Sequence, residues 1–328
     1  NNIYGKLFEL DSLGRIATLS YINNEGILMT DKFGVGSIKY TYDSLGETAT
    51  TKYLNNNKQL ANNEQKFAII SAKFDKYGNI IEQWNEGSDG QPCFDYQNIF
   101  KREITYDSNG CMTEIRFRDF DGNLSYCSNN FAIQRAKYDS KGRWLETSHF
   151  DIEDKPCYTK NNYSISRTKY NSSDCITEWN FYDIYGFPCV ETEYGAHMIK
   201  FTFDERNYIV ESSIYDVCNS KIISPTYGFH RQVNEYDDYH QIISVKFFDT
   251  NGNPCINTQL LCSSVHFSYD TRGNLTKIEN FDIRDEQCVG KNGYASVVYK
   301  YDSFGNLESE TYYGIDDKPI YINMCSSI

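Results

Sequence analysis

The sequence predicts an all-β protein, built from ten tandem antiparallel β-hairpin repeats of 32 or 33 residues. Three observations predict this class. An aromatic–Asp pair recurs at an almost constant interval. A residue that tolerates positive φ follows each pair, and long apolar stripes at helical spacing are missing. The 28 Tyr and 20 Phe favour strands, whereas the abundant Asp, Asn and Gly favour the turns between them.

The first turn of each copy is marked by the second residue of the aromatic–Asp pair, which is replaced by Leu10-Asp11 in the first copy and by Tyr170-Asn171 in the sixth. The ten anchors are Asp11, Asp43, Asp75, Asp107, Asp139, Asn171, Asp204, Asp237, Asp270 and Asp302. Three residues later stand Gly14, Gly46, Gly78, Gly110, Gly142, Asp174, Asn207, His240, Gly273 and Gly305. Gly, and after it Asn, Asp and His, best tolerate a left-handed backbone. The pattern predicts a type I turn closed by a bulge, with the anchor side chain accepting backbone N–H groups.

A second turn is expected twelve residues after the first, as in residues 150–157 and 182–189. Five of the six prolines follow this turn, where proline can begin a strand or lie at its edge: Pro92, Pro156, Pro188, Pro254 and Pro319. A short stretch then leads to the next copy. The first copies have poor second turns, so residues 1–63 are expected to be less regular, with an irregular loop at the Asn-rich residues 53–63.

The way the copies stack is indicated by a row of glutamates at one repeat position: Glu82, Glu114, Glu146, Glu178 and Glu211. In a solenoid these would stack at about 4.8 Å, but in a hairpin meander they lie about 9.6 Å apart. Like charges on neighbouring strands are destabilising, so the row favours the meander. Residues 1–328 are therefore interpreted as one repeat array of about twenty twisted strands, coiled into a spiral sheet.

Three copies carry a Tyr-Asp-x-x-Gly-Arg/Asn core, at residues 138–143, 269–274 and 301–306. With its tenfold recurrence, this core resembles the YD (RHS) repeat family over nearly the whole chain. The resemblance implies coiled β-hairpin sheets, used as a hollow shell around a toxin or as extracellular adhesion surfaces. The present repeat differs in being longer and in having the second turn that ends in Pro-Cys.

Charge and hydropathy exclude several classes of partner. With 32 Lys and Arg against 45 Asp and Glu, the formal net charge is −13. This disfavours nucleic acid, whose binding depends on neutralising phosphates, and it disfavours anionic membrane surfaces. No apolar run approaches the roughly 20 residues needed to span a bilayer, so no membrane insertion is expected. The first residues carry no signal-peptide pattern.

Eleven cysteines invite disulfide and metal hypotheses, and five of them share one repeat position: Cys93, Cys157, Cys189, Cys255 and Cys288. Equivalent cysteines about 10 Å apart cannot form disulfides, and no C-x-x-C occurs. The preferred interpretation is small free thiols packed under the turn. Pairing stays open among Cys111, Cys127, Cys175, Cys218, Cys262 and Cys325. A reducing, cytoplasmic compartment is favoured, with secretion or a cell-surface location as the alternative.

No catalytic constellation is found in the sequence. The five histidines are scattered; His197 and His230 share a repeat position, and His240 takes a positive-φ site, so structural roles are preferred. Nucleophile-elbow, Walker and H-E-x-x-H motifs are missing. The glutamate row could bind Ca²⁺ or a basic partner, but a solvated face is preferred. No catalytic, cofactor-binding or metal-binding residue is predicted, and the chain is expected not to be an enzyme.

The sequence therefore favours a scaffold that presents an aromatic, acidic surface to a protein partner, since Tyr is enriched at interfaces. One alternative is a carbohydrate-binding or adhesion module that uses Trp84, Trp144 and Trp179 as platforms. The other is a structural shell segment of a longer toxin-like polypeptide. The hairpin-turn residues with assigned structural roles include Gly46, Gly78, Gly110, Gly142, Gly273, Gly305, Asp139, Asp270 and Asp302.

Overall fold

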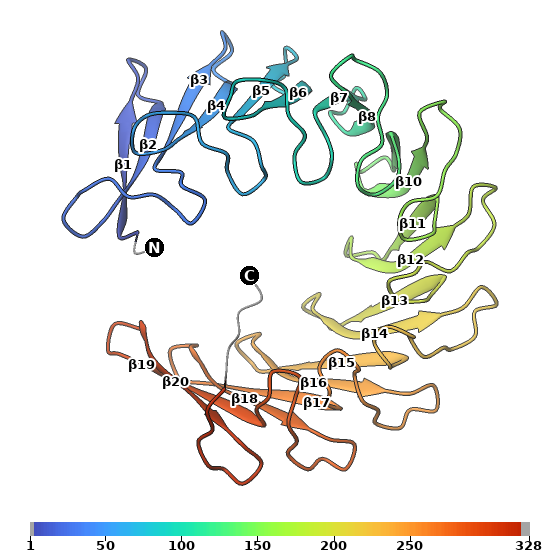
Figure 1. Ribbon diagram of the computed structural model, residues 1–328. Helices are drawn as coiled ribbons and strands as arrows, with labels where there is room; N and C mark the ends of the chain where they lie inside the picture. The colour runs from blue at the N-terminus through green and yellow to red at the C-terminus, as the bar shows by residue number, and fades with distance from the viewer. Residues whose placement is uncertain (1–2, 323–328) are drawn as a thin grey trace. The chain divides into compact units, whose positions relative to one another are not determined.

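The computed structural model describes residues 3–322, which contain twenty β-strands and no helix (Figure 1). The chain divides into two compact units, Asn1–Lys160 and Asn161–Ile328, each with ten strands. No helix able to cross a membrane occurs within residues 3–322.

Strands of the first unit follow one another in chain order. They are β1 (Gly5–Leu10), β2 (Ile16–Ile22), β3 (Ser37–Tyr42), β4 (Thr48–Leu54), β5 (Ile69–Phe74), β6 (Ile80–Glu86), β7 (Lys101–Tyr106), β8 (Met112–Arg118), β9 (Ile133–Tyr138) and β10 (Trp144–Phe150).

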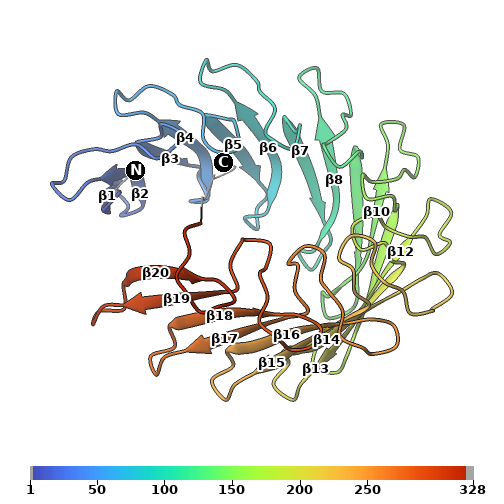
Figure 2. The ribbon, with the colours of Figure 1, turned by 60° about the horizontal axis from the view of Figure 1, so that its bottom comes forward.

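The second unit repeats the arrangement, and Figure 2 shows its later strands side by side. Its strands are β11 (Ile165–Tyr170), β12 (Ile176–Tyr182), β13 (Met198–Phe203), β14 (Ile209–Tyr215), β15 (Arg231–Tyr236), β16 (Ile242–Phe248), β17 (Ser264–Tyr269), β18 (Leu275–Phe281), β19 (Ser296–Tyr301) and β20 (Leu307–Tyr313).

In each unit every strand pairs antiparallel with its neighbours in the chain, which confirms the meander rather than the one-coil solenoid. The two strands of a hairpin pair along their full length, as β7 does with β8. Successive hairpins pair over a shorter ladder. For example, β8 pairs with β9 only where Glu114–Arg116 lie opposite Ile133–Arg135. The hairpin is thus the structural unit, and a short ladder joins it to the next.

The first turns show the expected hydrogen bonds. At Asp270, the carboxylate Oδ1 accepts the N–H groups of Arg272 and Asn274, both at 2.9 Å, and the Gly273 N–H donates to the Asp270 carbonyl at 3.0 Å. Asp139 and Asp302 accept the equivalent pairs of N–H groups. The register shifts by one residue beside the turn, as at Ser268/Tyr269. Positive φ angles occur at Gly46 (90°), Gly78 (85°), Gly110 (81°), Gly142 (78°), Gly273 (85°) and Gly305 (88°).

The tyrosine of the aromatic–Asp pair links consecutive hairpins. The Tyr106 hydroxyl donates to the carbonyl of Ile80 in the preceding copy at 2.9 Å, and the Tyr301 hydroxyl donates to that of Leu275 at the same distance. Tyr42, Tyr236 and Tyr269 make the same bond. The pair therefore has two functions, since the Asp closes a turn and the Tyr bonds its own hairpin to the preceding one.

The second turns repeat this chemistry even where the sequence predicts an irregular loop. That prediction, for residues 53–63, was wrong. Asn55 Oδ1 accepts the N–H groups of Asn57 (2.9 Å) and Gln59 (3.0 Å), and Lys58 adopts a φ of 62°. Asn replaces Asp because its side-chain oxygen accepts the same two bonds.

A third turn occupies what the sequence suggested was only a short connecting stretch. Its positive-φ residues are Gly34, Lys66, Asn98, Asn130, Asn162, Gly195, Gly228, Leu261 and Gly293. In the 32-residue copies the turn closes over five residues, as when the Asp95 N–H donates to the Ile99 carbonyl at 2.9 Å. In the three 33-residue copies it spans six, at residues 191–196, 224–229 and 257–262. The extra residue of those copies therefore lies here.

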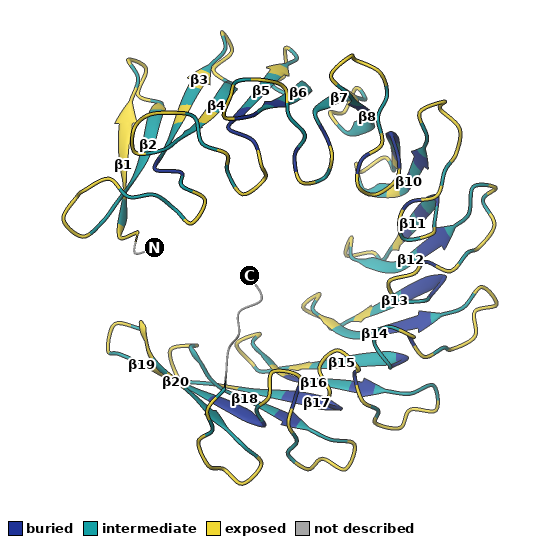
Figure 3. Cartoon of the chain, viewed as in Figure 1, coloured by how far each residue is buried: buried dark blue, intermediate teal, exposed yellow. Residues whose placement is uncertain are grey.

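Side chains alternate between two faces of each sheet. The third turns pack on one of them, here called the covered face. In the first unit Phe117 of β8 packs there with Ile99, Cys127 and Phe131 of the third turns. The equivalent cluster of the second unit contains Phe181, Ala196, Ile199 and Ile214. Figure 3 shows buried stretches in strands such as β10 and β13, whereas β1 is largely exposed.

Candidate binding surfaces

The opposite face, here called the charged face, contains the predicted glutamate row, and each glutamate of the row has a cation beside it. Glu82 pairs with Lys73 (3.2 Å) and Lys101 (2.9 Å). The other pairs are Glu114–Arg135 (2.6 Å), Glu146–Lys137 (2.7 Å), Glu178–Lys169 (2.8 Å) and Glu211–Arg231 (3.1 Å). The row is therefore neutralised by the chain itself and is not a free acidic stripe.

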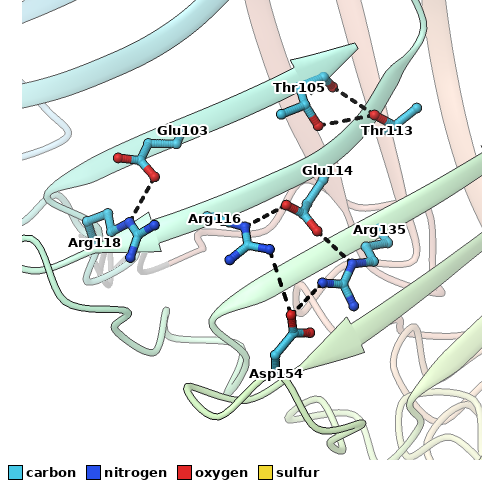
Figure 4. Close-up of polar contacts among 8 residues, drawn as sticks. All are labelled: Glu103, Thr105, Thr113, Glu114, Arg116, Arg118, Arg135 and Asp154. Atoms are coloured by element: carbon cyan, nitrogen blue, oxygen red, sulfur yellow. Dashed lines mark hydrogen bonds and ion pairs between the residues drawn. The ribbon is translucent and has the colours of Figure 1, made fainter. Parts of the chain in front are cut away.

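A four-residue network lies on this face in the first unit (Figure 4). Glu114 lies between the guanidinium groups of Arg116 and Arg135. Asp154, a second-turn residue with a φ of 61°, accepts Arg135 at 2.7 Å and lies 3.7 Å from Arg116. Burial raises the pKa of Glu114, but the hydrogen bonds from the two arginines outweigh it and lower the pKa below its usual value.

Aromatic rings lie beneath several cationic side chains of the charged face. The Arg135 guanidinium lies 4.2 Å from the centre of the Phe150 ring, and Arg167 lies 4.3 Å from that of Tyr182. Lys200 is placed in the same way over Tyr215, at 5.0 Å. In each case the third residue of a hairpin's first strand covers the last residue of its second strand. Arg135 is therefore held in place by a cation–π contact as well as by its ion pairs, and Arg167 and Lys200 make the same cation–π contact.

The three tryptophans proposed as platforms occupy three different environments. Trp84 lies on the charged face, where its indole N–H donates to Glu86 at 3.3 Å. Trp144 begins β10, opposite Tyr138. Trp179 lies on the covered face and packs against Phe181. They do not make one repeated platform.

Trp179 does line an aromatic hollow of about 160 Å³ in the second unit. The hollow lies between two third turns, and its other aromatic side chains are Tyr194, Phe201, Tyr227 and Phe229. Ser212 and Gln232 supply polar groups. Sequence reasoning found Trp179 but not its neighbours, because the third turns that carry Tyr194 and Tyr227 were not recognised.

The first-turn tips of the first unit expose large apolar side chains in three successive copies. The exposed fractions of Leu13, Leu45 and Tyr77 are 74%, 57% and 77%. Asn109 and Lys141 occupy the same turn position in the next two copies. A hollow of about 640 Å³ beside Tyr77 lies between the first turns of the third and fourth copies. Leu13, Leu45, Tyr77 and this hollow are here called the first-turn edge.

The repeated cysteines bond to the third turns. The Cys157 thiol donates to the Asn130 carbonyl of the preceding copy at 3.8 Å, and Cys189 and Cys255 make the equivalent contact. Burial is the largest cause that raises the pKa of these three thiols, to about 11. The ten cysteines within residues 3–322 are free thiols, and Cys325 lies outside the described residues.

The histidines pack as parts of the scaffold. His197 Nδ1 lies 2.7 Å from the Phe181 carbonyl, and His230 meets the Tyr215 ring edge-on. His240 adopts a φ of 68° and stacks on Tyr208. Among residues 3–322, no three His, Cys, Asp or Glu side chains gather as metal ligands.

Together, the fold and these surfaces define a tandem β-hairpin repeat protein. No family model matches the chain, and no curated protein matches its sequence.

Among solved structures, the chain is similar to a TcdB2–TccC3–Cdc42 complex, at 11% identity and a TM-score of 0.43, over 93% of this chain and 15% of that one. It is similar to the Tc holotoxin pore of Photorhabdus luminescens at 11% identity and a TM-score of 0.35, over 94% and 18%. It is similar to a porin-like protein from Bacteroides uniformis at 11% identity and a TM-score of 0.24, over 93% and 91%. The chain thus spans less than a fifth of the length of each of the first two of these chains.

Proposed function

We propose that this array is a non-catalytic scaffold that binds a protein partner through the first-turn edge. The observation that supports this is the exposure of Leu13, Leu45 and Tyr77 at three successive turn tips. The turn itself does not need apolar side chains, because Asn109 and Lys141 occupy the same position in copies with the same hydrogen bonds. Exposed apolar side chains that the fold does not require are typical of interaction sites.

The spacing and surroundings of these side chains suit a protein surface. Equivalent turns of successive hairpins lie two strands apart, or about 9.6 Å by the inter-strand spacing. Three such tips can engage separate pockets on one partner. The hollow beside Tyr77 can in turn accept a side chain of that partner.

The proposal is tested with a photo-crosslinking amino acid placed at Leu45 in the intact chain, expressed in its source cell. We expect one protein to be crosslinked at Leu45 and not at Phe304, a first-turn tip of the second unit that is even more exposed. Crosslinking that is equal at the two positions, or missing at Leu45, contradicts the proposal.

A triple variant, Leu13→Asn, Leu45→Asn and Tyr77→Asn, introduces the side chain found at Asn109. We expect it to keep the melting temperature and to reduce affinity for the crosslinked protein at least tenfold. The matched control, Tyr185→Asn, Phe187→Asn and Phe304→Asn, removes exposed rings of the second unit and should leave affinity unchanged.

The aromatic hollow beside Trp179 supports carbohydrate binding as a second candidate function. Aromatic faces with a few polar groups suit sugar rings, whose C–H faces are apolar and whose hydroxyls form hydrogen bonds. A glycan array screen of the whole chain tests this, with Tyr227→Ala expected to lose the signal and Trp84→Ala to keep it. A signal that survives Tyr227→Ala rules out the hollow as the site.

A further inference from the structure

We propose that a hollow on the charged face of the second unit, here called the second-turn notch, binds a guanidinium group. It lies between the second turns that follow β16 and β18 and has a volume of about 250 Å³. The residues that matter are Lys246 and Phe248 of β16, His266 of β17, and Asp285 of the turn after β18. This site is separate from the first-turn edge, so it does not depend on the function proposed above.

In the first unit, arginine side chains of the chain itself occupy the position that corresponds to the notch. Arg116 and Lys246 are each the fifth residue of the second strand of a hairpin, and Arg135 and His266 are each the third residue of the next strand. Asp154 and Asp285 are each the positive-φ residue of the following second turn, at 61° and 63°.

Glu114 corresponds to Ser244, and both lie directly opposite the third residue of the next strand. In the first unit, two guanidinium groups therefore occupy the space between Glu114 and Asp154. The notch is the same space without them.

In the notch the corresponding side chains contact residues other than Asp285. The His266 ring packs at a tilt against Phe281, with ring centres 4.5 Å apart. The Lys246 ammonium donates to Glu235 at 2.7 Å. No Lys, Arg or His side chain among residues 3–322 lies within ion-pair distance of the Asp285 carboxylate. The acceptor that holds Arg135 in the first unit is thus unpaired in the second.

Two buried polar atoms beside the notch are also unsatisfied. Ser244 is 3% exposed, and its Oγ has no hydrogen-bond partner within the described residues. His266 Nε2 is likewise buried and without a partner in that range. A buried polar atom without a hydrogen bond is unfavourable, so a polar ligand that supplies these bonds is favoured.

The geometry favours a guanidinium over an ammonium group. A guanidinium is planar and presents its N–H donors as a fork, so it can bind a carboxylate through two bonds and donate sideways to other acceptors. Its flat face stacks on apolar surfaces such as Pro254, which lines the notch, whereas the Phe248 ring already contacts the Arg231 guanidinium at 4.6 Å. Arg135 over Phe150 uses both properties in the first unit.

The test is a calorimetric titration of the whole chain with three probes: a short peptide with a central Arg, the same peptide with Lys, and free arginine. We expect the Arg peptide to bind at least tenfold more tightly than the Lys peptide. Binding of free arginine as tight as that of the Arg peptide identifies a small guanidino compound as the source, and weaker binding identifies a protein side chain. Equal binding of the Arg and Lys peptides, or no binding of either guanidinium probe, overturns the proposal.

Variants locate the site. Asp285→Asn should reduce Arg-peptide affinity at least tenfold and keep the fold, because Asn219 occupies this turn position with a φ of 60°. Asp317→Asn, at the same position one copy later, is the control and should have no effect.

The double variant Ser244→Glu, His266→Arg rebuilds the Glu114–Arg135 pair in the second unit. We expect it to raise the melting temperature and abolish binding, because the chain then fills its own notch. Unchanged Arg-peptide binding in Asp285→Asn, or in the folded double variant, overturns the proposal.

Discussion

Hairpin turns and third turns reverse the chain with the same positive-φ backbone, but they depend on different surroundings. A Cβ added at Gly186 or Gly252, in second turns, meets no atom within 4 Å. A Cβ added at Gly228, in a third turn, lies 2.8 Å from the Ile256 carbonyl and 2.6 Å from Thr258 Cγ2, both in the next copy. The second turns at Gly186 and Gly252 therefore constrain only the backbone angle, whereas the six-residue third turns at Gly195 and Gly228 also constrain how one copy packs on the next.

The largest expected loss of unfolding free energy distinguishes the constraint on the backbone angle from the constraint on packing between copies. Gly252→Ala should cost about 1 kcal/mol of unfolding free energy, from its positive φ alone. Gly228→Ala should cost about 3 kcal/mol or more, because steric overlap with the next copy adds to the backbone strain. Urea unfolding of both variants measures the difference, and equal losses would contradict the packing role of the third turn.

A smaller difference in unfolding free energy is expected between the acidic residue that closes a third turn, Asp95, and the one that closes a hairpin turn, Asp107. Asp95 and Asp107 each accept two backbone N–H groups in the same pattern. Only Asp95, whose side chain is 1% exposed, also pairs with an arginine, Arg102, at 2.7 Å. Asp107→Ala should cost about 1 kcal/mol and Asp95→Ala about 3 kcal/mol, since Arg102 loses its buried partner.

Asp95→Asn keeps the turn acceptor but removes the charge. Its unfolding free energy should lie closer to that of Asp95→Ala than to that of the unsubstituted chain. A loss below about 1 kcal/mol would show that the ion pair contributes little.

This contrast also explains what the sequence could predict. A hairpin turn is closed by its own residues, so Asp270 and Gly273 form a local pattern that recurs tenfold and predicts the meander. The third turn is closed by residues as different as Asp95, Cys127 and Ser224, because contacts with the next copy help to hold it. Its one sequence signal is a recurring Gly or Asn, which Lys66 and Leu261 interrupt.

The candidate surfaces were predictable to a smaller extent for the same reason. The glutamate row was visible, but the cations that neutralise it come from neighbouring strands and become evident only with the register. Trp179 was visible as an aromatic residue, yet its hollow depends on third turns. The notch at Asp285 appears only when Ser244 and His266 are compared with Glu114 and Arg135 in aligned strands.

The smallest expected effect is acid sensitivity of the hairpin turns. The backbone N–H groups of Arg143 and Tyr208 are the largest cause that lowers the pKa of Asp139 and Asp204, respectively, and the Asn274 side chain is the largest for Asp270. A lowered folded-state pKa stabilises the fold above the ordinary value of 3.8, and this stabilisation is lost as pH falls through the folded-state value.

Below pH 3.8 the amides of Arg272 and Asn274 should therefore lose hydrogen-exchange protection before that of Thr258, whose third turn is anchored by the non-ionisable Asn257. Simultaneous loss at all three amides would contradict this order.

The central claim is that third turns stack on one another through backbone hydrogen bonds. The amides of Ser128, Lys160, Thr258 and Lys291 donate to the carbonyls of Gln97, Asn129, Tyr227 and Leu260 in the preceding copies, at 2.7–2.9 Å. The most direct measurement is NMR hydrogen exchange at these four amides near neutral pH. The stacked arrangement predicts protection close to that of amides in the strands. Exchange as fast as that of solvent-exposed amides at the hairpin tips would contradict it.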